Sequence, residues 1–382
     1  MKRSLQRILT THTGSLPRPP ELLPLLRSKD SGESVDRGAF ESAVKSAVVE
    51  VVRKQEAAGL DIVNDGEMGK ISYSTYVKDR LTGFEGESEA FAPRLIDGGE
   101  FPEYYQRFFA SLGSVAAMKR PACTGPIGYH SKSELQRDLD NFKESLNGVR
   151  VEDTFMSAAS PGVISMFLAN KYYPTNEAYL GALADAMKTE YEAITEAGFL
   201  LQLDCPDLAV GDIRLPITAL DEFRKNAAVH VNALNQAVAN IAPDRMRLHA
   251  CWGNSEGPHN HDVALKDLID IVLKARPAGL SYVAANPRHE HEYKVFRDVK
   301  LPDGKVLIPG VIDSTTNFIE HPELIADRIC NLARIVGRDN VIAGTDCGFG
   351  TVAGFELVDS KVAWAKLKAL AEGARLASAQ LW

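Results

Sequence analysis

Two side chains that bind zinc well lie two residues apart in the segment Leu248-His249-Ala250-Cys251. This segment is predicted to end a β-strand, in which residues i and i+2 point to the same face. The imidazole of His249 and the thiol of Cys251 should therefore face together, and both groups are good ligands for Zn²⁺. Taken alone, the pair is a weak signal for a metal, and two buried core residues are the more common interpretation.

A third soft ligand, Cys347, follows the last predicted strand in the segment Gly344-Thr345-Asp346-Cys347-Gly348. If the strands close into a barrel, their C-terminal ends converge, and barrels place their chemistry at that end. His249, Cys251 and Cys347 are then expected to form one zinc site. Three protein ligands leave the fourth position open for water or substrate, which is the pattern of catalytic zinc.

Polar groups also follow other predicted strands. Thr13, Gly14 and Ser15 end the first strand, Glu67 comes shortly after the second, and Asp204 ends the fifth. Each of these groups alone is typical of a turn or a helix N-cap. Several of them at the same end of one barrel favour a polar substrate pocket beside the zinc ligands.

Two histidine-rich stretches, 258–262 and 286–292, compete as metal sites. Both are predicted to open helices, where acidic residues suit the first turn and histidines two residues apart point away from each other. Neither stretch is therefore expected to bind a metal. Arg288, within the second stretch, is a candidate for binding a substrate anion, and the alternative is a surface ion pair.

The chain alternates short apolar runs with amphipathic stretches along its whole length. Several runs are continuously apolar, as is typical of strands that are covered on both faces. The predicted strands are 8–15, 61–64, 121–129, 154–160, 200–204, 247–251, 280–285, 306–313 and 341–346. The predicted helices are 40–58, 176–197, 220–242, 263–276, 322–336 and 360–381.

This alternation predicts an α/β fold with a parallel sheet, and about eight repeats favour a (β/α)8 barrel of the TIM type. A doubly wound open sheet is the alternative. Nine strand-like runs are one too many for the barrel, and 121–129 is the expected extra run because it follows the irregular stretch 83–113. We predict one domain over residues 1–382, with an insertion at about 83–130 after the second strand.

Composition argues against several classes of protein. The 382 residues are 45% hydrophobic and 25% charged, which is the ordinary range of globular proteins. The net charge of −8 disfavours nucleic acids and anionic membranes as partners. No apolar run approaches the roughly 18–20 residues of a membrane span, and the first eight residues lack the apolar core of a secretory signal. Five cysteines are too few for a disulfide framework, which predicts a reducing, cytoplasmic location. The expected partners are small molecules, and the sequence is compatible with a homo-oligomer.

Five ordered motifs cover nearly the whole chain: Thr10-Thr11-His12-Thr13-Gly14-Ser15-Leu16-Pro17, Asp65-Gly66-Glu67, Gln202-Leu203-Asp204, His249-x-Cys251 and Asp346-Cys347-Gly348. Together they resemble the catalytic, C-terminal barrel of the cobalamin-independent methionine synthase family. The segments 248–256, 284–292 and 306–323 are most similar to the short, single-barrel branch of that family. This branch includes the zinc-dependent epoxyalkane:coenzyme M transferases.

The resemblance implies a (β/α)8 barrel with zinc held by His249, Cys251 and Cys347. In the family the metal lowers the pKa of a substrate thiol, which binds as thiolate and attacks an electrophilic carbon. By the same resemblance, polar residues at the other strand ends would contact the thiol substrate: Thr13, Gly14, Ser15, Glu67 and Asp204. The two acids are the predicted catalytic side chains, and they would hold the amino group if the substrate is homocysteine.

The chain departs from the family pattern at two places. Many members carry a glutamate zinc ligand on the strand after the H-x-C motif, and Val283 stands at that position here. A family histidine expected shortly after Asp313 is absent, and Ser314-Thr315-Thr316 stands there instead. Valine cannot bind a metal, so water is expected as the fourth ligand. These changes favour thiol alkylation in general over methionine synthesis in particular.

Two reactions share this chemistry: methyl transfer to homocysteine or a similar thiol, and addition of a thiol such as coenzyme M to an epoxide. Two metal-free alternatives belong to other classes, namely a lyase like uroporphyrinogen decarboxylase and a barrel that only binds a small molecule. The soft ligands argue against the lyase, because porphyrinogen decarboxylation needs cationic and acidic groups. We predict a zinc-dependent methyltransferase or alkyltransferase that acts on a small thiol and an alkyl donor.

Overall fold

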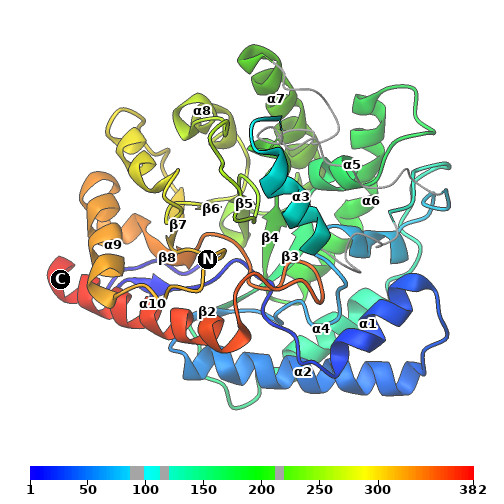
Figure 1. Cartoon of the computed structure of the whole chain (residues 1–382), viewed down its shortest axis with the longest axis horizontal. Coiled ribbons are helices and arrows are strands. Elements are labelled where there is room, and N and C mark those ends of the chain that lie inside the picture. The colour runs from blue at the N-terminus through cyan, green and yellow to red at the C-terminus, as the bar shows by residue number, and fades with distance from the viewer. Residues whose placement is uncertain (87–98, 112–119, 211–218) are drawn as a thin grey trace.

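Eight parallel strands form a barrel in the computed structural model, which describes residues 1–86, 99–111, 120–210 and 219–382. Neighbouring strands follow the order β1-β8-β7-β6-β5-β4-β3-β2 (Figure 1). The strands are β1 (Leu9–Thr10), β2 (Ile62–Val63), β3 (Asp153–Ala159), β4 (Leu200–Asp204), β5 (Met246–Ala250), β6 (Gly279–Tyr282), β7 (Val306–Ile312) and β8 (Ile342–Thr345). The predicted TIM-type (β/α)8 barrel is confirmed.

Hydrogen bonds between β1 and the start of β2 close the barrel. The N–H of Asp61 donates to the carbonyl of Thr10 at 3.1 Å. The carboxylate of Asp61 accepts the N–H of Thr10 at 2.9 Å and the guanidinium of Arg7 at 2.6 Å. Because the first and second strands meet in this way, the alternative of an open, doubly wound sheet is wrong.

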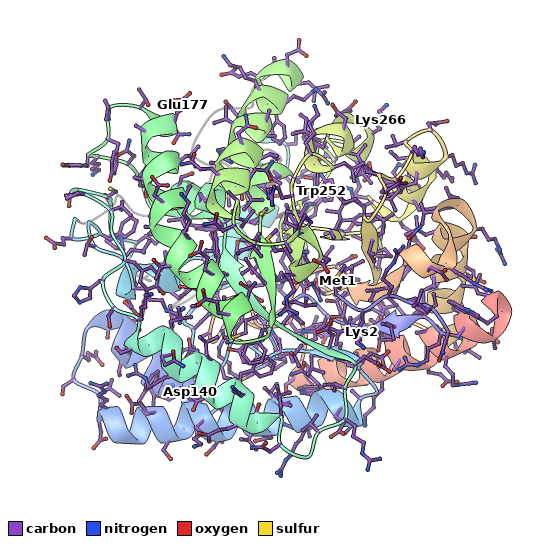
Figure 2. The ribbon with its side chains drawn as sticks, turned by 180° about the vertical axis from the view of Figure 1, so that it is seen from behind. Met1, Lys2, Asp140, Glu177, Trp252 and Lys266 are labelled. Atoms are coloured by element: carbon purple, nitrogen blue, oxygen red, sulfur yellow. The ribbon has the colours of Figure 1, made fainter. Side chains whose placement is uncertain are left out.

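Apolar side chains fill the barrel near the N-terminal ends of its strands. They form one buried cluster: Leu9, Ile62, Phe155, Leu200, Val306, Ile308 and Ile342. Met1, which is labelled in Figure 2, packs against this cluster. Its ammonium donates to the carbonyl of Asp244 at 2.6 Å. This packed end leaves the C-terminal ends of the strands to form a site.

Helices surround the barrel: α1 (Leu22–Ser31), α2 (Arg37–Ala57), α3 (Pro102–Ser111), α4 (Ser133–Ser145), α5 (Pro161–Phe167), α6 (Asn176–Glu196), α7 (Leu220–Ala237), α8 (Ile269–Val272), α9 (Pro322–Val336) and α10 (Ser360–Leu381). Short 3-10 helices lie in the connections: η1 (Thr75–Asp79), η4 (Pro206–Leu208), η5 (Pro243–Arg245), η6 (Leu265–Asp267), η7 (Glu290–Arg297) and η8 (Arg338–Asn340). Local signals set several helix starts. Asp36 caps α2 by accepting the N–H of Ala39 at 2.8 Å, and α9 begins at Pro322, a residue that suits the first helical position.

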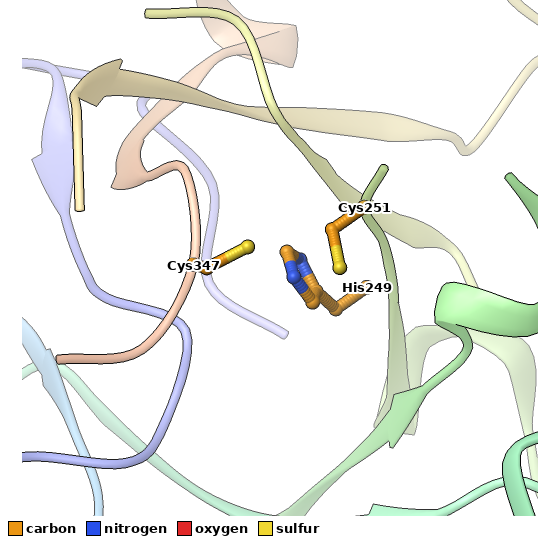
Figure 3. Close-up of side chains that lie close together, drawn as sticks. All are labelled: His249, Cys251 and Cys347. Atoms are coloured by element: carbon orange, nitrogen blue, oxygen red, sulfur yellow. The ribbon is translucent and has the colours of Figure 1, made fainter. Parts of the chain in front are cut away.

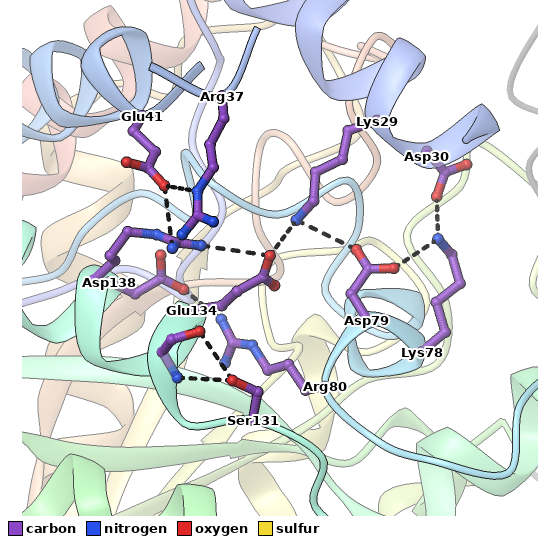
Figure 4. Close-up of polar contacts among 12 residues, drawn as sticks. Lys29, Asp30, Arg37, Glu41, Lys78, Asp79, Arg80, Ser131, Glu134 and Asp138 are labelled. Carbon is purple, nitrogen blue, oxygen red and sulfur yellow. Dashed lines mark hydrogen bonds and ion pairs between the residues drawn. The ribbon is translucent and has the colours of Figure 1, made fainter. Parts of the chain in front are cut away.

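Ion pairs join α1, which lies between β1 and β2, to η1 and α4, which follow β2. Lys29 on α1 contacts Asp79 on η1 at 3.4 Å and Glu134 on α4 at 3.2 Å. Lys78 on η1 contacts Asp30 on α1 at 2.8 Å (Figure 4). These contacts fix η1 and, through it, the loop that connects β2 to η1.

Five predicted helices correspond to α2, α6, α7, α9 and α10, whereas the predicted helix 263–276 is divided between η6 and α8. The helices α1, α3, α4 and α5 were not predicted, and α3 lies within the stretch 83–113 that was expected to be irregular. The extra run 121–129 is not a strand of the barrel and forms isolated bridges such as Gly86↔Ala122 and Leu81↔Tyr129. Part of the predicted insertion, 83–130, lies outside the described residues, and its bounds stay a prediction. In the described ranges, no helix combines the length and the apolar character needed to cross a membrane.

Candidate metal centre

Three buried side chains that can bind a metal ion lie together at the C-terminal ends of the strands. His249 is on β5, Cys251 comes directly after that strand, and Cys347 follows β8. One imidazole nitrogen and the two sulfur atoms lie within 4.8 Å of one another (Figure 3). The structure therefore brings the three predicted ligands together, and one imidazole with two thiols is a donor set that suits zinc.

The register of the sheet explains the orientation of His249. Asp204 on β4 and Ser281 on β6 are both register partners of His249, so the three side chains form one row across three strands. Nδ1 of His249 lies 3.2 Å from Oγ of Ser281. A hydrogen bond donated by Nδ1–H to that oxygen leaves Nε2 unprotonated, which is the form that binds a metal.

The two thiols of the group affect each other's acidity. The hydrogen bond with Cys347 lowers the pKa of Cys251 well below its usual value, and His249 lowers it further. The same bond raises the pKa of Cys347 well above its usual value. Without a metal the pair thus favours one thiolate and one thiol, whereas a bound divalent cation favours the thiolate form of both.

The neighbour of Cys347 in the chain holds the loop after β6. The carboxylate of Asp346 accepts N–H bonds at 2.7–2.8 Å from three successive residues of that loop: Ala284, Ala285 and Asn286. Burial raises the pKa of Asp346 to about 7, and the charge of Asp313 adds to the shift. Gly310 provides the necessary space, because a Cβ there would lie 1.9 Å from Oδ1 of Asp346.

Val283, which the resemblance aligns with the family's glutamate ligand, lies at the level of Cys251. Ser281 and His249 are register partners on neighbouring strands. Val283 comes two residues after Ser281, just as Cys251 comes two residues after His249. The side chain of Val283 is buried. Continued by one residue, this register sets Val283 beside Cys251, and the valine side chain cannot bind a metal.

Glu67 and Asp204 are buried acids whose charges interact. The backbone of Glu67 has a φ of +58°, which is rare for a residue other than glycine. Its buried Oε2 atom has no hydrogen-bond partner among the described residues. A Cβ on Gly14 would lie 2.7 Å from Oε1 of Glu67, so only glycine permits this approach. Burial raises the pKa of Asp204 well above its usual value, and the charge of Glu67 raises it further. A positively charged group would stabilise this pair.

The other residues predicted to contact substrate lie on the loop after β1, which is bonded to the segment after β8. The hydroxyl of Thr13 donates to the carbonyl of Thr345 at 3.0 Å, and its N–H donates to Oγ1 of the same residue at 3.1 Å. The carbonyl of Ser15 accepts the N–H of Phe349 at 2.8 Å. These bonds place the loop at the end of the barrel that carries the metal ligands.

Arg288 is bonded to backbone carbonyls. Its guanidinium donates from Nε to the carbonyl of His259 at 3.0 Å and from an Nη atom to the carbonyl of Asn260 at 3.1 Å. These bonds join the two histidine-rich stretches of the chain. The predicted role of Arg288 in binding a substrate anion stays a prediction, and the residue has a structural role in addition.

The histidine-rich stretches form a chain of hydrogen bonds beside the metal centre. Nε2 of His289 lies 3.0 Å from Asp262, and its Nδ1 lies 2.8 Å from Glu292. Burial opposes the charged ring, but the bonds to these carboxylates raise the pKa of His289 to about 9. The imidazole stacks on Trp252, the residue after Cys251, with ring centroids 4.4 Å apart.

Tyr73, which is not among the residues predicted for the site, belongs to the same end of the barrel. Its N–H donates to the carbonyl of Thr351 at 3.2 Å, and its ring lies edge-on to Phe167 at 6.0 Å between centroids. Burial raises the pKa of Tyr73 well above its usual value, and the nearby Cys251 and Asp204 raise it further. The phenol is therefore neutral beside the anionic groups of the site. No motif surrounds Tyr73, so only the packing of distant loops identifies it.

Proteins named methionine synthase align with nearly the whole chain. The methionine synthase of Sulfolobus acidocaldarius is 25% identical over 374 residues, which cover 97% of this chain and 93% of that protein. The methionine synthase of Pyrococcus furiosus is 25% identical over 370 residues, which cover 96% of this chain and 91% of that protein. No protein-family model matches the chain.

The chain is thus similar over nearly its whole length to proteins named methionine synthase. The resemblance predicted from the five motifs is thereby confirmed. Two solved structures share the fold of this chain. A B12-independent methionine synthase from a Shewanella species, in complex with selenomethionine, has a TM-score of 0.74 at 18% identity, and the match covers 98% of this chain and 99% of that one. A putative B12-independent methionine synthase from Listeria monocytogenes has a TM-score of 0.64 at 19% identity, with the same coverage.

Proposed function

We propose that this methionine synthase relative is a zinc-dependent enzyme that transfers a methyl group to homocysteine or to a similar small thiol. The observation that carries the proposal is the group formed by His249, Cys251 and Cys347, with ligand atoms within 4.8 Å of one another. The names of the relatives, which align over nearly the whole chain, support methyl transfer as the reaction.

The side chains of the site have distinct tasks in this proposal. His249, Cys251 and Cys347 would hold zinc, which lowers the pKa of a substrate thiol and so makes it a nucleophile at neutral pH. Glu67 and Asp204 would bind the ammonium group of an amino-thiol, because a cation relieves the repulsion between two buried carboxylates.

Gln202 fixes the position of one of these acids. Its side-chain amide donates to Oδ1 of Asp204 at 2.8 Å and also to the carbonyl of Thr13. Gln202 therefore fixes the position of Asp204 relative to the loop after β1. Such pre-arrangement reduces the entropy lost when a substrate binds between them.

The alternative reaction, addition of a thiol to an epoxide, would use the same metal site. A thiol that lacks an amino group would leave Glu67 and Asp204 without a cation, so the acid pair favours an amino-thiol. Arg288, the candidate for binding an anionic thiol, already donates to two carbonyls. The metal-free alternatives are a decarboxylating lyase and a non-catalytic barrel, and neither would use the thiols of Cys251 and Cys347.

Metal analysis tests the proposal directly. Protein purified without chelator should contain about one zinc per chain, and Cys251→Ser and Cys347→Ser should each lose zinc and activity while still folding, because a site at the strand ends is separate from the barrel core. Cys330→Ser is the matched control, since Cys330 is a buried thiol on α9 that contacts Gln380 at 3.6 Å. Folded protein that takes up no zinc on reconstitution would contradict the proposal.

A substrate screen separates the two reactions. Homocysteine and coenzyme M would each be offered with methylfolates, small methylated metabolites and epoxides, and the products would be identified by mass spectrometry. Methylated homocysteine is the expected product. A product formed only from coenzyme M and an epoxide would favour the alternative reaction.

The cytoplasmic location, the organisation as one domain over residues 1–382 with an insertion at about 83–130, and the compatibility with a homo-oligomer stay predictions from the sequence.

A further inference from the structure

Three segments at the C-terminal end of the barrel meet in a hydrogen-bonded bridge beside the metal ligands. Oγ of Ser314, after β7, donates to Oδ1 of Asn254 at 2.8 Å and accepts the N–H of Cys347 at 3.1 Å. Nδ2 of Asn254, after β5, donates to the carbonyl of Gly348 at 3.0 Å. The two residues therefore connect the segment that carries Cys251 with the segment that carries Cys347.

The bridge restrains the backbone of Cys347 on both sides. It binds the N–H of Cys347 and the carbonyl of the following residue, Gly348. Other bonds hold the same segment in other directions: Asp346 reaches the loop after β6, and the hydroxyl of Thr345 donates to the carbonyl of Cys347 at 2.9 Å. Asn254 supplies the connection toward the segment of the other cysteine ligand.

Ser314 is suited to hold a position rather than to transfer a proton. It stands where the resemblance leads one to expect a histidine, and a serine hydroxyl does not titrate near neutral pH. The residue is 2% exposed, and its hydroxyl both donates one hydrogen bond and accepts another. Removing this hydroxyl would leave the N–H of Cys347 and Oδ1 of Asn254 without their partner, which loosens both segments.

We propose that Asn254 and Ser314 are positioning residues that hold Cys251 and Cys347 at ligand distance before a metal binds, and that they thereby set the affinity of the site for zinc. The proposal rests on the metal site of the proposed function. Ligands that are already in place lose little conformational freedom on binding. Residues that orient metal ligands typically change metal affinity by roughly 10- to 100-fold.

Zinc affinity of single variants tests this proposal. Ser314→Ala removes both bonds of the hydroxyl, and Asn254→Ala also removes the link to Gly348. Each should raise the Kd for Zn²⁺ by roughly 10- to 100-fold, measured by competition with a chromophoric chelator. Ser314→Thr keeps a hydroxyl and should restore the affinity. Thr316→Ala is the matched control on the same loop, because Thr316 contacts Asp313 through its backbone N–H.

Cobalt-substituted protein gives an independent readout. The thiolate-to-cobalt absorption should weaken or shift in Ser314→Ala and keep its wild-type form in Ser314→Thr. An unchanged Kd in both alanine variants, or an equal loss in Thr316→Ala, would overturn the proposal while the zinc enzyme stands. A wild-type chain that binds no zinc would overturn the proposed function as well. If Ser314→Ala does not fold, the Kd of Asn254→Ala for Zn²⁺ decides whether the bridge sets the affinity. This substitution breaks the same bridge at a half-buried position.

Discussion

The buried acids Glu67 and Asp204 are only partly neutralised by the nearest lysine. Lys70 opposes the rise in the pKa of Asp204, yet that pKa stays well above its usual value. The Nζ of Lys70 donates to the carbonyl of Ser157 at 2.6 Å and lies 4.3 Å from the centroid of the Tyr76 ring. These contacts hold the ammonium of Lys70 beside Ser157 and Tyr76. The acid pair therefore retains affinity for the cation of a substrate.

Replacing one acid tests whether the substrate carries an amino group. Asp204→Asn should raise the KM for homocysteine by roughly ten- to a hundredfold, because a charge-assisted hydrogen bond contributes about 1.5–3 kcal/mol. A thiol without an amino group should show little change in KM. Asp140→Asn, at an exposed position on α4, is the control. An unchanged KM for homocysteine would show that the pair does not bind its amino group.

The same substitution should stabilise the substrate-free protein. Burial and the charge of Glu67 disfavour the ionised form of Asp204, so at pH 7 the folded protein loses stability either by keeping this carboxylate ionised or by taking up a proton, and an amide avoids that cost. The melting temperature of Asp204→Asn should therefore be higher than that of the wild type, whereas Asp140→Asn should leave it unchanged. A lower melting temperature would mean that the acid has a favourable partner in the free protein.

A glutamate at the position of Val283 should add a fourth protein ligand. Val283 lies two residues beyond the register partner of His249, at the level of Cys251. In Val283→Glu, X-ray absorption at the zinc edge should show one additional protein oxygen at about 2.0–2.2 Å, and the metal should bind more tightly. Val283→Ala is the control, since it adds no ligand. Identical coordination in the glutamate variant and the wild type would show that this position does not face the metal.

At the scale of elements, a buried ion network fastens the loop after β5 to the loop after β6. Asp262 precedes η6, and His289 and Glu292 lie at the start of η7. Glu292 also accepts the N–H of Leu265 on η6 at 2.7 Å. Because His289 stacks on Trp252, the network supports the backbone directly after Cys251. The stability of this region should therefore depend on the charge of one histidine.

The pH dependence of unfolding tests this network. The pKa of His289 rises from 6.5 to about 9 on folding, so its stabilising effect is fully present below about pH 6.5 and is lost as the pH rises through 9. The groups that face it are Asp262, Glu292, Trp252 and His259. His289→Gln should lower the free energy of unfolding, and the part of this loss that comes from the charge of the histidine should depend on pH. That part should be on the order of 3 kcal/mol at pH 6 and approach zero above pH 9.5.

Urea unfolding at several pH values measures this difference between wild type and variant. His130→Gln is the control, because His130 is exposed. A loss in free energy that is the same at pH 6 and pH 9.5 would show that the imidazole acts by packing and not by charge.

At the scale of the whole molecule, the seam between β1 and β2 closes the barrel. Both strands have only two residues, so the contacts of Asp61 account for much of the connection. This carboxylate binds the N–H of Thr10 and the guanidinium of Arg7, whereas Glu152 contacts the same guanidinium at 3.1 Å from an exposed position. The two acids allow a matched comparison at one arginine.

Removing Asp61 should weaken the fold far more than removing Glu152. Asp61→Ala should lower the free energy of unfolding by about 2–3 kcal/mol, because hydrogen bonds to a charged group are lost and the N–H of Thr10 loses its partner. Glu152→Ala should cost less than about 1 kcal/mol, as is typical of an exposed ion pair. Denaturant titration of both variants measures the difference, and equal effects would show that the seam does not depend on Asp61.

The residue types at the strand ends and the rhythm of the elements could be predicted from the sequence, because both are local properties. His249 and Cys251 share a face through the period of a strand, and Cys347 follows an apolar run that ends in a turn. The predicted bounds 322–336 and 360–381 agree with α9 and α10, which begin at Pro322 and after the capping residue Asp359. Signals of this kind lie within a few residues of the feature that they determine.

Only the tertiary structure decided how the site is held. Asn254 is bonded to Ser314 across 60 positions of the chain and to Gly348 across 94, and no local pattern records such pairs. The left-handed conformation of Glu67 likewise carries no sequence signature, since non-glycine residues rarely adopt it. Closure of the barrel brings the distant loops together, and their contacts determine which ligands meet and how firmly they are positioned.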